Sequence, residues 1–267
     1  MVPDKYDKNS FTKEDESVSL GNKLLYDFCE QYELDNSVNA LVAKLWIIGR
    51  SYAASPERRR YKTEGISKEK GKGTDLFFSK LAEYIINSNE YEDIVKQVNA
   101  IKTDTYKYDK KEDATLLAKT IHLVVCFNRM LKKSIIHFDN KDESLEIEDV
   151  KINNFISFAS KLMHFHLPKT MFIIDQYSRQ NAFHKEKNEF IHFSDSIKCR
   201  IEESSYETFK EDVASYAKTK DETFELNSVE KEYFKHAILC YLYMLKLHEQ
   251  LNNATVTPRM VDNFLLH

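Results

Sequence analysis

The chain has 267 residues, of which 42% are hydrophobic and 31% are charged, as in soluble globular proteins that bury a sizeable core. Its formal net charge is −4, and its five glycines and four prolines argue against a turn-rich β architecture. The four cysteines form no CxxC pair, so we expect no disulfide framework and a reducing, cytoplasmic location.

The N-terminal half reads as a polar arm followed by helices. Residues 1–17 lack apolar periodicity, which predicts a mobile arm ahead of a single all-α domain at residues 18–267. Helical spacing of apolar residues predicts one helix over residues 18–32. A second helix should begin at an N-cap, Asn36 or Ser37, and run through Ala54. The same spacing predicts helices over residues 75–87, 91–101 and 113–136, and one that ends near Met163.

The C-terminal part continues the helical pattern. Helices are predicted over residues 204–217 and 228–251, and a last one begins at Thr257 and Pro258, a cap followed by proline. Residues 185–198 are expected to be irregular, and no strand longer than Met171–Ile174 is predicted. The expected fold is therefore all-α with about ten helices, either in one globular body or in two helical lobes with a cleft between them. No signal peptide is visible, and no apolar run approaches the roughly 18 residues that span a bilayer, so a membrane partner is not expected.

Positive charge is concentrated between residues 41 and 73. This segment has nine basic and three acidic residues, a net charge of +6, so the rest of the chain carries −10. Residues 61–74 are predicted to form a basic loop or lid, and Ser55 before Pro56 predicts a short helix that displays three arginines. The segregation predicts a phosphate-binding surface, with tyrosine stacking on a base, made by Arg50, Tyr52, Arg58, Arg59, Arg60 and Lys62. The alternative is a solvated loop in which Glu57 pairs with an arginine of the same chain.

The stretch from Phe155 to His184, FISFASKLMHFHLPKTMFIIDQYSRQNAFH, carries the candidate chemistry. A helix with apolar periodicity is predicted to end in a loop at Pro168. A short apolar run follows the loop, and Asp175 comes directly after this run, at the start of another helical pattern at residues 176–183. This layout resembles the catalytic segment of the helix-hairpin-helix DNA glycosylase superfamily. The resemblance implies that the hairpin grips the DNA backbone and that Asp175 stabilises positive charge developing on the sugar.

The same resemblance suggests roles for the neighbouring residues. Bifunctional members of the superfamily use a lysine that forms a Schiff base, a role that Lys161 could take if burial lowered its pKa. His164 is a third candidate catalytic residue, expected close to Asp175 as its hydrogen-bonded partner unless it is a core histidine, and Arg179 is expected to bind nucleic acid. DNA is preferred to RNA as the partner, no cofactor is implied, and the oligomeric state stays open.

Three alternatives compete with the glycosylase-like interpretation. Asp175 could be a helix N-cap, in which case the chain is a non-catalytic helical interaction module. Arg179 and His184 resemble the arginine–histidine motif of HEPN ribonucleases, which are all-α and use this pair at a dimer interface. His164, His166 and Asp175 could in principle hold a metal, but histidines two positions apart at a helix end point in different directions, so no metal site is predicted.

Overall fold

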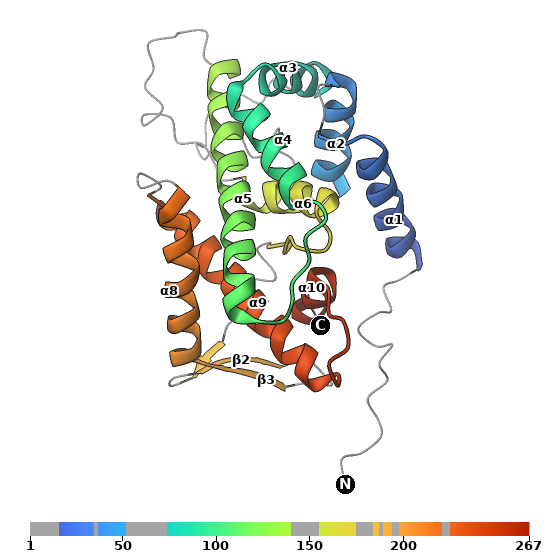
Figure 1. Cartoon of the computed structure of the whole chain (residues 1–267). Helices are drawn as coiled ribbons and strands as arrows, with labels where there is room; N and C mark the ends of the chain where they lie inside the picture. Colours follow the sequence, from blue (N-terminus) through green and yellow to red (C-terminus); the bar gives the residue numbers. More distant parts are fainter. Residues whose placement is uncertain are drawn as a thin grey trace.

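Helices dominate the computed structural model of the chain (Figure 1). It describes residues 16–34, 37–51, 74–139, 155–174, 184–186, 189–193, 198–220 and 225–266. Within these residues there are nine helices and one small sheet, which confirms the all-α class predicted from the sequence. The helices are α1 Glu16–Gln31, α2 Val38–Ser51, α3 Thr74–Ile86, α4 Asn89–Ile101, α5 Lys110–Asp139, α6 Ile156–His166, α8 Glu203–Lys220, α9 Ser228–Gln250 and α10 Pro258–Leu266.

Helix α5 is the long element around which the other helices are arranged. It contacts α3, α4 and α6 along one part of its length and α8 and α9 along another, as Figure 1 shows. Leu117, Leu123 and Val125 are completely buried although they project to different sides of the helix, because α5 has neighbours on several sides. The stretch Lys110–Ile136 is long and apolar enough to span a membrane, which was not predicted from the sequence. However, 72% of its most apolar 18-residue window is buried inside the molecule.

Three helix starts show how local chemistry sets the helix boundaries. The Ser37 hydroxyl accepts a hydrogen bond from the Ala40 amide at 3.3 Å, as its predicted capping role requires. The Thr257 hydroxyl likewise accepts a 3.3 Å hydrogen bond from the Met260 amide, and Pro258 follows it at the first position of α10. Asn227 and Glu230 form a capping box at α9, in which each side chain accepts a bond from the other residue's backbone.

A three-stranded antiparallel sheet occupies the segment that was predicted to be irregular. The strands are β1 His184–Glu186, β2 Glu189–Phe193 and β3 Lys198–Glu202, in the order β1-β2-β3, and β3 contacts α8 and α9. Phe190 pairs with Ile201 across β2 and β3, and both side chains are buried. Strands of three to five residues contain too few alternations for a period of two to stand out in the sequence, which is why the prediction was wrong.

The short apolar run Met171–Ile174 is extended and buried but is not a strand. Its described hydrogen bonds go to α6 and the turn that follows it, since the Met171 amide bonds to Leu167 O and the Ile174 amide to Ser160 Oγ. One cluster of buried apolar side chains extends from Leu25 in α1 to Leu265 in α10. The arm was predicted over residues 1–17, but Glu16 and Ser17 already belong to α1. Residues 1–15 of that arm, the short helix after Ser55, the basic loop up to residue 73 and the predicted helix at 176–183 lie outside the described residues.

Candidate functional site

Helix α6 is enclosed by protein on nearly every side. It contacts α1, α2 and α5, and every residue from Ile156 to His166 is buried except Ser157. Its start is fixed by the Phe155 amide, which donates a 2.9 Å hydrogen bond to Oδ1 of the buried Asn128 in α5. A helix that is apolar all round belongs in a core, so the polar residues on α6 need an explanation.

Lys161 is one of these polar residues, and its side chain is 4% exposed. Lysine is seldom this deeply buried, because removing an ammonium group from water is costly unless the protein supplies partners. Lys161 and His164 are three positions apart, which places their side chains on neighbouring turns of the same side of the helix. The sequence reasoning had singled out both residues for catalysis.

His164 is completely buried and both of its ring nitrogens are engaged. Nδ1 lies 2.7 Å from the Met171 carbonyl oxygen and Nε2 lies 2.6 Å from the Tyr26 hydroxyl. A carbonyl oxygen can only accept, so Nδ1 carries a proton; in the neutral ring, which complete burial favours, Nε2 then accepts a hydrogen bond from the Tyr26 hydroxyl. His164 therefore ties α6 to α1 and to the extended segment that follows α6.

The chain turns back along α6 directly after the helix ends. The Leu167 amide bonds to Met163 O at 2.8 Å, and the Met171 amide bonds to Leu167 O at 2.9 Å. The Ile174 amide then donates a 3.3 Å hydrogen bond to Ser160 Oγ, and the same Oγ lies 3.4 Å from the Ile174 carbonyl oxygen. Ile174, the last described residue before Asp175, is thereby held beside the residue that precedes Lys161.

The opposite side of α6 carries a second histidine in a positively charged interior. Burial lowers the pKa of His166 from 6.5 to about 3, with smaller contributions from the charges of Lys44 and Lys102. Its Nε2 is buried without a hydrogen-bond partner among the described residues. Since residues 164 and 166 project to different sides of the helix, they do not converge on one ligand, and no group of three or more metal-binding side chains occurs in the described ranges.

Lys44 of α2 is a buried cation that the sequence reasoning did not select for a site. It is 1% exposed, and its Nζ donates a 2.7 Å hydrogen bond to the Glu33 carbonyl oxygen, while the Glu33 carboxylate pairs with Lys102. Burial raises the pKa of the nearby Cys29 thiol to about 12, although the positive charge of Lys44 opposes the shift. A sequence signal existed, since position 44 lies three residues after Leu41 and four before Ile48, on the apolar face.

Most of the predicted nucleic-acid surface lies outside the described residues. Arg50 is exposed at the C-terminal end of α2, and α2 contacts α6. His184 begins the strand β1. The remaining predicted residues that the structure does not describe are Tyr52, Arg58, Arg59, Arg60, Lys62, Asp175 and Arg179.

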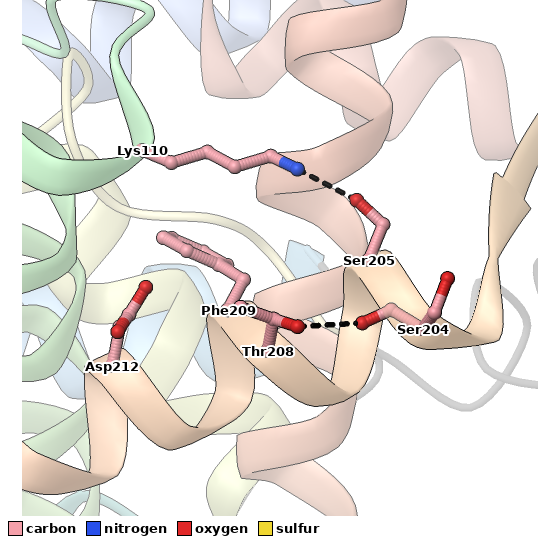
Figure 2. A pocket seen from close by; sticks show the side chains of 6 residues that line it. All are labelled: Lys110, Ser204, Ser205, Thr208, Phe209 and Asp212. Carbon is pink, nitrogen blue, oxygen red and sulfur yellow. Dashed lines mark hydrogen bonds between the residues drawn. The ribbon is translucent and has the colours of Figure 1, made fainter.

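An open pocket of about 250 Å³ lies where the start of α5 meets the start of α8 (Figure 2). Lys110 lines the pocket and donates a 2.7 Å hydrogen bond to the Ser205 hydroxyl. Asp212 lines it one helical turn beyond Thr208 and Phe209. Neither Lys161 nor His164 lines this pocket. This helix was predicted to begin at residue 204, but α8 begins at Glu203, directly after β3, so Ser204 and Ser205 both lie within its first turn.

Comparison of the chain with models of known protein families, with curated proteins and with solved structures finds no match.

Proposed function

We propose that the protein binds nucleic acid and acts on DNA in the manner of a DNA glycosylase/lyase, at a site formed by α6 and the chain after it. The observation that carries the proposal is the 3.3 Å hydrogen bond from the Ile174 amide to Ser160 Oγ. This bond holds the chain position directly before Asp175 against the turn of α6 that carries Lys161. It provides a physical basis for a lysine and an aspartate acting on one substrate.

Lys161 supplies the nucleophile in this proposal. Its amine attacks C1′ of a deoxyribose as the glycosidic bond breaks, and the base leaves with the bonding electrons and takes up a proton. The new C–N bond becomes a Schiff base when the sugar ring opens, and the Asp175 carboxylate offsets the positive charge that develops on the sugar. An amine attacks only in its unprotonated form, and desolvation is a general means of favouring that form.

Two further observations bear on how DNA is held. The segment between residues 41 and 73 carries a net charge of +6 in a chain of net charge −4, which suits a duplex backbone. Its described part includes the exposed Arg50, on a helix that contacts α6. Because Lys161 is only 4% exposed, a nucleotide reaches its amine only after the protein around α6 opens.

A trapping assay tests the proposed chemistry. Labelled duplexes, both undamaged and lesion-bearing, would be incubated with the protein and borohydride, which reduces a Schiff base to a stable covalent adduct. We expect an adduct with the wild type, none with Lys161→Gln, and strongly reduced base release with Asp175→Asn. Lys169→Gln is the matched control, because Lys169 is exposed in the turn after α6 and should leave the adduct unchanged.

The outcomes of this assay separate the competing functions. RNA cleavage that survives in Asp175→Asn but is lost in His184→Ala would replace the proposal with a HEPN-like ribonuclease. Absence of activity on every DNA and RNA substrate, with Asp175→Asn only less stable than the wild type, would make Asp175 a helix cap. The chain would then be better explained as a helical interaction module.

DNA affinity at several salt concentrations tests the binding step separately. Replacing the three arginines at 58–60 with alanine should weaken binding and make the slope of log K against log salt less steep by up to about 2.7. The matched control replaces three exposed lysines outside the basic segment, at positions 111, 119 and 231, and should leave the slope unchanged. Equal effects of the two triple variants would contradict a specific basic surface.

A further inference from the structure

Helix α1 is apolar on two sides. Its inner side packs into the molecule through Leu25 and Cys29, which are 7% and 2% exposed. Its outer side carries Leu20 and Leu24, which are 60% and 61% exposed. In Figure 1, α1 stands at the edge of the molecule, beside α2. A surface helix ordinarily turns a polar face to water, so the second apolar side needs a partner or a reason.

The outer side forms a continuous ridge. Leu20, Leu24 and Phe28 recur every four residues, and Tyr32 follows at 40% exposure with its ring 5.1 Å from that of Phe28. We call these four residues the α1 ridge. Ridges formed by every fourth residue are the surfaces through which helices most often interdigitate. Single exposed leucines are common, but a row at this spacing has the form of a helix-packing surface.

Two opposite charges flank the α1 ridge on one side. Lys23 and Asp27 are both exposed, and their side chains form no hydrogen bond or ion pair within the part of the chain that the structure describes. Within one helix, a lysine four positions before an acidic residue is the less favourable order for pairing. If a second α1 crosses antiparallel with the two-fold axis beside Leu24, Lys23 and the partner's Asp27 lie about 3 Å apart along the helix axis. The symmetry then makes this ion pair twice.

We propose that the α1 ridge is the interface of a homodimer, in which two copies of α1 pack antiparallel around Leu24. The occupant is a second copy because one flank carries both members of the ion pair, so the surface is self-complementary, as a two-fold interface requires. The contact buries both copies of Leu20 and Leu24 and pairs Lys23 with the partner's Asp27. This inference does not depend on the proposed function.

Sedimentation velocity over a range of protein concentrations tests the apolar contact. We expect a concentration-dependent dimer for the wild type and a monomer for Leu24→Glu, whose dimer affinity should fall by on the order of a hundredfold because both copies lose the side chain. Val229→Glu is the matched control, since Val229 is 37% exposed on α9, and it should dimerise like the wild type. A wild type that stays monomeric, or a dimer that survives Leu24→Glu, would overturn the proposal.

Charge exchange at Lys23 and Asp27 tests the pairing itself. Lys23→Asp and Asp27→Lys each place like charges opposite one another and should weaken the homodimer several-fold. The two variants mixed together should form a heterodimer, and the variant carrying both changes should dimerise like the wild type. Both residues are exposed, so thermal unfolding temperatures measured at concentrations where every protein is monomeric should not change. Failure of both the mixture and the exchanged variant to restore dimerisation would refute the antiparallel arrangement.

Discussion

The Tyr26 hydroxyl donates a 2.6 Å hydrogen bond to Nε2 of His164, joining α1 to α6 across 138 positions of the chain. The direction of this bond follows from two facts: Nδ1 must donate to the Met171 carbonyl oxygen at 2.7 Å, and complete burial favours the neutral ring, in which Nε2 can only accept. A single neutral tautomer of His164 therefore connects the edge helix, the buried helix and the extended segment that leads to Asp175.

Tyr26→Phe should destabilise the protein by about 1–3 kcal/mol. The substitution keeps the ring but removes the donor, leaving Nε2 of the fully buried His164 without this partner. Chemical denaturation would measure the change in the free energy of unfolding. Tyr32→Phe provides the control, because Tyr32 is 40% exposed, and its loss should stay within about 0.5 kcal/mol. Equal losses in the two variants would mean that the Tyr26–His164 bond contributes nothing specific.

Stability should fall as the pH is lowered from 6.5 toward 3 because of His166. The folded protein keeps this side chain neutral down to a pKa of about 3, whereas the unfolded chain protonates it near the ordinary value of 6.5. Between these values the unfolded state binds more protons, so acid favours unfolding, by on the order of 3 kcal/mol at pH 4. The free energy of unfolding of the wild type should drop more between pH 7 and pH 4 than that of His166→Gln. An identical drop in both proteins would rule out His166 as the source.

Arg129→Met should lower the free energy of unfolding by about 2–3 kcal/mol. Lys133→Met, one turn further along α5, should lower it by less than about 1 kcal/mol. Arg129 Nη2 lies 2.7 Å from Glu230, whose side chain is 0% exposed, so its removal strands a buried carboxylate. Lys133 pairs with Glu90 at 3.0 Å, but both side chains are 52% exposed. Thermal or chemical unfolding of the two variants gives the comparison, and a ratio near one would show that burial of Glu230 does not control the cost.

Alkylation should distinguish Cys126 from the other three cysteines. Burial raises the pKa of Cys29 and of Cys199 to about 12 and raises that of Cys240 further, so these thiols hold almost no thiolate at pH 8. Cys126 is only partly buried. Mass spectrometry after brief treatment of the native protein with iodoacetamide should find Cys126 modified first and the other three modified only after unfolding. Modification of Cys29 at the same rate as Cys126 would contradict its burial.

The helical architecture could be read from the sequence because it depends on local patterns. Apolar side chains recurring at helical spacing predicted the described helices to within a few residues, and Ser37 and Thr257 marked two starts correctly. The sheet escaped notice because strands of three to five residues contain too few alternations to show a period of two, although they pair with their sequence neighbours. The capping box of Asn227 and Glu230 was present in the sequence but was not recognised.

The candidate site combines sequence features with tertiary contacts. The order of residues around Lys161 and Asp175 suggested a chemistry, and composition determined that the chain folds as helices around a large core. Only the tertiary structure decided that Lys161 is 4% exposed, that Tyr26 reaches His164, and that Ser160 holds Ile174 beside α6. The tertiary structure also decided that Leu20 and Leu24 of the α1 ridge are exposed to solvent. Burial and long-range hydrogen bonds depend on which elements pack together, whereas helix formation depends mainly on residues three and four positions apart.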